Sequence, residues 1–222
     1  MSWLRRMRGE QGMSLIELII GMSIMSLVLL VFTSLLPTVQ NSVNRQDSMS
    51  QTLDQTRGAL EQLDREMRSG NVLYDPALEN AAVGVAGRIT SCTGCVPGYT
   101  LRVYTQTNAN TRAGSGTNGF RCVLWKIQDQ QIMTQWWPPL DPDLVSGWRV
   151  VATGIVNRDL SLPAFSLDSD PLKLGRTLNV LYAANSNLAH LPQQTIRVQA
   201  SLTGRNTSYG YPANVCLETP VG

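Results

Sequence analysis

The sequence predicts an α+β protein in which one long N-terminal helix precedes a head domain built on an antiparallel β-sheet. Residues 13–36 are apolar or small at almost every position, and a helix-like spacing of apolar residues follows them up to Gly70. Beyond Gly70 apolar and polar residues alternate, which is typical of strands that place one face on a core. The part after the helix has about 150 residues, the usual size of one compact domain.

The apolar run, residues 13–36, is long enough to cross a membrane as a helix. Three arginines lie within the first eight residues, and the next basic residue is Arg45. The positive-inside rule therefore predicts a cytoplasmic N-terminus and an extracytoplasmic head. A cleaved secretory signal peptide is the alternative, but its apolar core would be only about 7–15 residues long and would end at a small-x-small site. This run ends in Leu35-Leu36-Pro37 instead, which favours a membrane span.

Residues 37–69 are expected to continue the helix outside the membrane. Pro37 should kink or locally open it, because proline donates no backbone hydrogen bond. Gly70 followed by Asn71 is a typical stop signal. One stripe of residues recurs every three or four positions and predicts the face that the head covers, namely Met49, Leu53, Thr56, Leu60, Leu63 and Met67.

Glu17 is the only charged residue in the apolar run. A carboxylate at the centre of a span costs roughly 2.5–3.5 kcal/mol on insertion scales and less near the interface, so a tolerated interfacial acid is one interpretation. The residues around it, "GMSLIELIIGMSIMSLVLLVF", resemble the N-terminal signature of type IV pilins and type II secretion pseudopilins. In that superfamily a short basic leader ends in glycine, and a glutamate is the fifth residue of the mature chain.

This resemblance implies a processing site and an assembly residue. Residues 1–12 would be the leader, which a prepilin peptidase removes between Gly12 and Met13. Met13, which stands where the family usually has Phe, would carry the new α-amino group and be N-methylated. In a fibre Glu17 could then pair with the amine of a neighbouring subunit, and a matched pair relieves much of the cost of burying one charge.

The head, residues 70–222, shows a period of two in six stretches. These predicted strands are 100–105, 120–127, 131–137, 148–156, 177–183 and 194–202. The pieces between them are rich in Gly, Pro, Asn and Ser, as antiparallel loops are. The strand order resembles that of large minor pilins of the PilW kind and of GspJ-like pseudopilins.

The four cysteines all follow the apolar run, and in an exported head they are most simply disulfides. Cys92 and Cys95 in "CTGC" could also indicate a metal or redox site, but a structural zinc site usually needs a second close pair. Of the three possible pairings, Cys92–Cys95 with Cys122–Cys216 is preferred. It lets the local pair close locally, and it anchors the Gly- and Pro-rich C-terminal tail.

Other chemistry is sparse in the head. His190 is the only histidine and has no catalytic or metal motif around it. The paired aspartates in "LDPDL" (140–144) and "LDSDP" (167–171) could bind calcium but lack the rest of a calcium loop, so Asp-Pro turns are favoured. Trp136, Trp137 and Trp148 could form a binding shelf, although core packing is the simpler interpretation. We expect no catalytic activity, no cofactor and no metal.

The chain has 18 basic and 16 acidic residues, a net charge of +2, so composition gives no case for nucleic acid as the main partner. The sequence predicts a minor type IV pilin. Its expected partners are the prepilin peptidase, a major pilin, other minor pilins, the inner-membrane assembly platform and the membrane itself. It would be a single-pass inner-membrane protein before it joins a pilus or pseudopilus. A type II secretion pseudopilin, or a pilus-borne adhesin or DNA-uptake receptor, is the alternative.

Overall fold

The computed structural model describes residues 14–79, 95–106, 119–139, 144–168, 177–189, 191–204 and 215–216. It confirms the α+β class, with one long N-terminal helix and antiparallel sheets. The chain divides into two compact units, residues 1–47 and 48–222.

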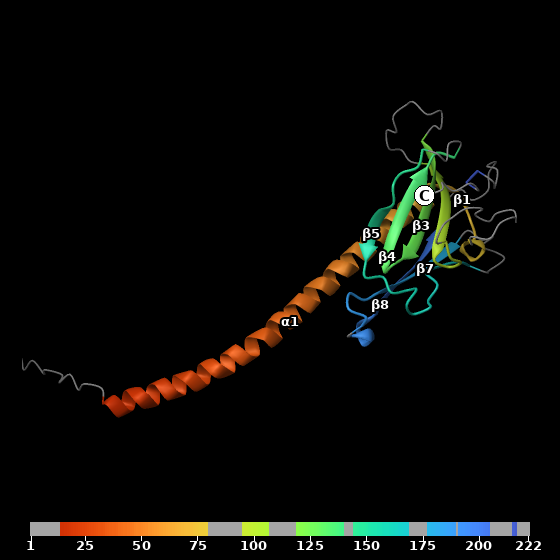
Figure 1. Ribbon diagram of the computed structural model, residues 1–222. Coiled ribbons are helices and arrows are strands. Elements are labelled where there is room, and N and C mark those ends of the chain that lie inside the picture. Colours follow the sequence, from red (N-terminus) through yellow and green to blue (C-terminus); the bar gives the residue numbers. More distant parts are fainter. Residues whose placement is uncertain are drawn as a thin grey trace, which may run out of the picture. The chain divides into compact units, whose positions relative to one another are not determined.

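The helix α1 spans Leu15–Arg68, 54 residues, and Figure 1 shows it as one uninterrupted coil. The opening expected at Pro37 does not interrupt it, since every residue from Leu15 to Arg68 is helical. The helix ends at Arg68, two residues before Gly70. A Cβ at Gly70 would lie 3.0 Å from the carbonyl oxygen of Met67 and 3.2 Å from Cγ1 of Val103, so glycine favours the close approach of the chain to the sheet at this point.

The described strands of the head form two antiparallel sheets, where the sequence predicted one. The first has the order β1-β2-β3-β4-β5 and the second the order β6-β7-β8. Two short 3-10 helices, Pro76–Leu78 and Pro192–Gln194, lie between strands. The strands of the first sheet are β1 (Gly70–Leu73), β2 (Thr100–Gln106), β3 (Phe120–Gln128), β4 (Gln131–Trp137) and β5 (Arg149–Thr153). Those of the second sheet are β6 (Phe165–Leu167), β7 (Thr177–Ala184) and β8 (Ile196–Thr203).

A two-residue turn joins β3 to β4. Asp129 and Gln130 have φ values of 51° and 58°, and Gln128 pairs with Gln131 across the hairpin. Positive φ at both central residues is the geometry of a type I′ turn, whose twist matches that of the flanking strands. Neither residue is glycine, so this turn carries backbone strain.

One apolar core joins α1 to both sheets. Its buried members include Ala59 and Leu63 of α1, Trp125 of β3, and Leu178 and Leu202 of the second sheet. The face of α1 that packs on the core differs in part from the predicted stripe, because small residues permit the closest approach. The buried helix residues are Thr52, Thr56, Ala59, Leu63, Glu66 and Met67.

The first sheet carries a second, smaller cluster on its other face. Cys122, Leu124 and Trp137 alternate along β3 and β4 with the residues that face α1, and they pack with Tyr74, Tyr104, Cys95 and Cys216. This face is therefore covered by the segment after β1 and by the C-terminal tail.

Backbone contacts link the two sheets. The carbonyl of Gly98, just before β2, accepts hydrogen bonds from the N–H groups of Ala164 (2.8 Å) and Phe165 (2.9 Å) at the start of β6. On the other side Ile155, just after β5, forms an isolated bridge with Ala184 at the end of β7. The sheets are thus joined at both ends of the core.

Candidate functional site

The apolar first part of α1 is the candidate site, and we call residues 15–36 the stem. Ser14 precedes it, and its carbonyl accepts the N–H of Glu17 at 3.0 Å and that of Leu18 at 3.2 Å. Glu17 therefore lies in the first helical turn. Gly12 and Met13, where cleavage and N-methylation were predicted, lie outside the described residues.

The large apolar side chains of the stem are all exposed. Their exposed fractions range from 44% at Val28 to 78% at Leu15. By length and composition α1 is able to cross a membrane. So continuous an apolar surface is unfavourable in water and needs lipid or other subunits around it.

The hydroxyl groups of the stem are satisfied within the helix itself. Ser23 and Ser26 each donate to the carbonyl four residues earlier, both at 2.8 Å, and Ser34 donates to Val31 at 2.8 Å. Thr33 shares its hydroxyl hydrogen between the carbonyls of Leu29 and Leu30, at 3.0 Å each. Such internal bonds are what an apolar environment requires, because it offers polar groups no other partner.

Glu17 is different, since its side chain makes no hydrogen bond or ion pair with any residue that the structure describes. Its carboxylate lies on the helix surface among exposed apolar side chains. The geometry thus agrees with a stem that is completed by lipid and by neighbouring molecules.

The cysteines lie in the head. A disulfide joins Cys122 of β3 to Cys216 in the tail, across 94 residues of sequence. Cys95 is also disulfide-bonded. Cys92 lies outside the described residues, so the Cys92–Cys95 bridge stays a prediction.

A buried ion pair lies beside the Cys122–Cys216 bridge. Arg102 of β2 and Glu79 are both fully buried, and Nη2 of Arg102 lies 3.0 Å from Oε1 of Glu79. The guanidinium also stands 4.2 Å from the ring centroid of Tyr74 and donates from Nη1 to the carbonyl of Cys216. The N–H of Cys216 donates to the hydroxyl of Tyr74 at 3.0 Å. These contacts hold the tail against the sheet.

Burial opposes the charge on Glu79. Loss of water raises the pKa of its carboxyl to about 7, although Arg102 acts in the other direction. The second oxygen, Oε2, has no hydrogen-bond partner among the described residues. Glu79 therefore changes its protonation near neutral pH.

Glu66 is a buried carboxylate that sequence reasoning missed, at the end of α1. It accepts a hydrogen bond from Nε1 of Trp125 at 2.7 Å and one from Nε2 of Gln62 at 3.1 Å. Arg121 of β3 lies 3.5 Å away, and Arg149 of β5 also attracts its charge. Burial nevertheless raises the pKa of the Glu66 carboxyl. The contacts fasten the last turn of α1 to the first sheet, which is a structural role.

The three tryptophans do not form one shelf. Trp137 is buried in the second cluster, and Trp148 covers Lys126, whose ammonium lies 3.9 Å from its ring centroid. Trp136 alone of the three is exposed, at 41%. His190 and the "LDPDL" aspartates lie outside the described residues, and within the described part no group of three or more His, Cys, Asp or Glu side chains could hold a metal ion.

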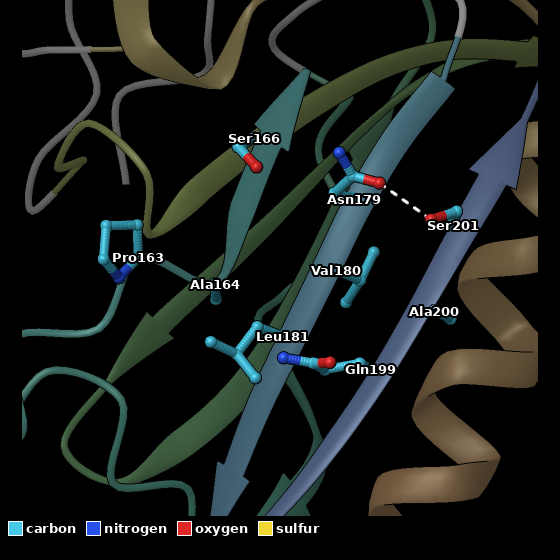
Figure 2. Close-up of a pocket in the computed structure, with 9 residues that line it drawn as sticks. All are labelled: Pro163, Ala164, Ser166, Asn179, Val180, Leu181, Gln199, Ala200 and Ser201. Carbon is cyan, nitrogen blue, oxygen red and sulfur yellow. Dashed lines mark hydrogen bonds between the residues drawn. The ribbon is translucent and has the colours of Figure 1, made fainter. Parts of the chain in front are cut away.

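A hollow of about 490 Å³ lies on the second sheet, and Figure 2 shows the residues that line it. Asn179 of β7 and Ser201 of β8 line it, and Oγ of Ser201 donates to Oδ1 of Asn179 at 2.8 Å. Ser166 and Gln199 complete the polar part of its surface. None of the residues that line it is titratable.

Comparison with known proteins addresses the stem. A family model described as the prokaryotic N-terminal methylation motif matches residues 7–33. The match includes Gly12, Met13 and Glu17, and it supports a protein of the type IV pilin or pseudopilin class that a prepilin peptidase processes. No curated protein matches the chain.

Proposed function

We propose that this protein is a minor type IV pilin, a structural subunit that is stored in the membrane and then joins a pilus. One observation carries the proposal. A carboxylate without a partner in the described chain lies in the first turn of an exposed apolar helix, within the residues that match the methylation motif.

The proposed chemistry uses the new N-terminus. Cleavage between Gly12 and Met13 frees an α-amino group four residues before Glu17, and methylation keeps its positive charge. Because the stem offers Glu17 no partner, this amine on a neighbouring subunit is the natural one. A lone carboxylate in an apolar fibre core is strongly unfavourable, whereas a paired one is tolerated and fixes the register between stems.

The head supports a minor rather than a major role. The sequence between β2 and β3, residues 107–119, is a long Gly-, Ser- and Asn-rich connection. A long surface loop is difficult to repeat at every position of a lattice, and such loops commonly carry binding function. A type II secretion pseudopilin remains the second candidate, because the matched motif is common to both classes.

Intact-mass analysis of membrane and pilus fractions tests the processing. We expect a mature chain that begins with methylated Met13. A chain that begins at Met1, or beyond Leu36, would refute the assignment.

The role of Glu17 is tested by Glu17→Ala. The variant should insert into the membrane normally but enter fibres poorly, because the neighbouring amine loses its counter-charge. Glu61→Ala, which removes an exposed carboxylate of the same helix, is the matched control and should assemble normally. Normal assembly of Glu17→Ala would show that Glu17 is only a tolerated interfacial acid.

Quantitative mass spectrometry of sheared filaments tests the minor role. This chain should be scarce beside a separate major pilin. If it is the most abundant subunit, the minor-pilin proposal is wrong, although the wider class would stand.

A further inference from the structure

The hollow on the second sheet is lined by four hydrogen-bonding side chains that come from three neighbouring strands. Ser166 of β6 pairs with Asn179 of β7, and Asn179 pairs with Ser201 of β8, so these three residues form one row across the sheet. Gln199 stands two residues before Ser201 and therefore on the same face. We call these four residues the polar cluster, and Figure 2 shows them around the hollow.

The polar cluster lies on the face of the sheet that is turned away from the core. Val180, which follows Asn179 in β7, is a buried member of the core, so the side chain of Asn179 points the other way. On β8 the same alternation leaves Gln199 and Ser201 exposed and buries Leu202. The hydrogen-bonding groups of the cluster are thus open to solvent.

Much of the hydrogen-bonding capacity of the polar cluster is unused. The hydroxyl of Ser201 donates to Oδ1 of Asn179 at 2.8 Å, which orients the Asn179 amide and leaves its Nδ2 hydrogens without an acceptor among the described residues. The side chains of Ser166 and Gln199 make no hydrogen bond within the described part of the chain. Because each amide carries donors and an acceptor side by side, the cluster offers both kinds of group at once.

The lining of the hollow restricts the class of ligand. None of the described residues that line it carries a charge, so an ionic ligand finds no counter-charge there. The charged residue next to it on this face of β8, Arg197, lies outside the lining. A purely apolar ligand would cover the amides of Asn179 and Gln199 without bonding to them, which costs free energy for each polar group that loses water. The ligand that fits is neutral and forms several hydrogen bonds.

A sugar meets these requirements better than a peptide. Residues that pair across strands have Cβ atoms about 5 Å apart, and Gln199 is about 7 Å from Ser201 along β8. So compact a group of donors and acceptors suits the hydroxyls of a sugar ring, each of which both donates and accepts. An extended peptide carries its polar groups along one line and bonds to a strand edge rather than to side chains on a face. Leu181 and Pro163 also line the hollow and offer an apolar surface to the C–H groups of a ring.

We propose that the polar cluster binds a neutral carbohydrate. The amides of Asn179 and Gln199 would each hold two adjacent hydroxyls, with the N–H donating to one oxygen and the amide oxygen accepting from the other. Ser166 and Ser201 would bond to the hydroxyls beside them. This inference goes beyond the proposed function and does not depend on it, because the isolated chain would bind the sugar without forming a fibre.

The test measures sugar binding by the purified full-length chain. The detergent is zwitterionic, since the headgroup of a glucoside or maltoside would itself compete for the hollow. An array of neutral and sialylated oligosaccharides is screened first, and lactose, cellobiose and diacetylchitobiose are then titrated by saturation-transfer NMR. Sialyllactose is the charged probe, and a triglycine peptide blocked at both ends is the peptide probe.

The variants separate the amides from the rest of the sheet. Asn179→Ala and Gln199→Ala each remove one amide, and Arg197→Ala is the matched control on the same face of β8. Thermal unfolding checks that the variants fold as the parent does. Gln199 is exposed and its side chain makes no hydrogen bond within the described part of the chain, so Gln199→Ala still tests the inference if Asn179→Ala unfolds.

We expect a neutral sugar to bind, and its Kd to rise about tenfold in Asn179→Ala and in Gln199→Ala, because each variant loses two hydrogen bonds to the ligand. The Kd should be unchanged in Arg197→Ala. The inference is overturned if no neutral sugar binds, if only sialylated sugars bind, or if the peptide binds as tightly as the sugar. Equal Kd values in the parent and the folded amide variants, or loss of binding in Arg197→Ala, would also overturn it.

Discussion

Replacing Glu79 with glutamine should leave the stability of the protein unchanged at low pH and increase it above neutral pH. Glu79 is fully buried beside Arg102, and burial raises the pKa of its carboxyl to about 7, against 4.5 for the group in water. The folded head therefore keeps this proton at pH values where the unfolded chain has lost it. The stability that Glu79 contributes is present below about pH 4.5, falls as the pH rises, and levels off above about pH 7.

The size of the effect follows from the two pKa values. A pKa difference of about 2.5, at about 1.4 kcal/mol per pH unit, corresponds to about 3 kcal/mol. Glutamine has the shape of the protonated carboxyl and does not titrate. Glu79→Gln should thus match the parent near pH 4 and be more stable by up to about 3 kcal/mol at pH 8, even though it removes an ion pair.

Urea unfolding of the detergent-solubilised chain measures this, with fluorescence of the buried Trp125 and Trp137 as the signal. Asp64→Asn is the control, because Asp64 pairs with Arg68 on the solvated side of α1, where such a pair contributes only about 0–1 kcal/mol. If Glu79→Gln instead becomes less stable than the parent as the pH rises, Arg102 outweighs burial and the reasoning is refuted.

Two further predictions concern the head. Cys122→Ser should lower the free energy of unfolding by about 4 kcal/mol, because the bridge to Cys216 closes a loop of 94 residues and holds the tail over Arg102. A change below about 1 kcal/mol in urea unfolding would contradict this. Gln130→Gly should raise the thermal midpoint, because φ is 58° there. A left-handed conformation costs a residue other than glycine roughly 1–2 kcal/mol, which is more than the roughly 0.4–1 kcal/mol that the freedom of glycine in the unfolded chain costs. The same change at Gln131, in β4, should lower the midpoint, and equal shifts at both positions would show that turn strain is not the cause.

The sequence alone was sufficient for the stem and for most of the head strands. The stem is a continuous apolar run, and six strands had a clear period of two, so local composition specified them. The strands β1 and β6 were missed because they have only four and three residues, too few for a period. The alternation of apolar and polar residues shows which side of a strand faces the core, but it does not show to which sheet the strand belongs. The separation of the head into two sheets was therefore not predicted.

The residues by which α1 packs on the head could likewise be predicted only in part. The burial of Glu66 was not predicted, because charged residues usually lie in solvent, yet the indole N–H of Trp125 and the amide of Gln62 donate hydrogen bonds to it inside the protein. Ala59 replaces larger residues at the centre of the contact because α1 and the sheets approach closely there. In both cases the burial of the residue depends on partners that are distant in the sequence, and the spacing of apolar residues along the helix does not show these partners.

The carboxylates of α1 and the head differ in one respect that bears on function. Glu66 and Glu79 are buried, and the same chain supplies each with donors: Trp125, Gln62 and Arg121 for the first, Arg102 for the second. Such groups stabilise or tune the fold, and their partners are found wherever the head is folded. Glu17 lies in equally apolar surroundings once lipid covers the stem, but no described residue of its own chain reaches it. A carboxylate left unpaired in an apolar segment is neutralised by a proton, lies at the interface or is paired by another molecule. Glu17 lies in the first turn of the stem, where the proposed assembly would pair the charge without moving the helix. The absence of a partner among the described residues is the structural observation that supports this proposed pairing.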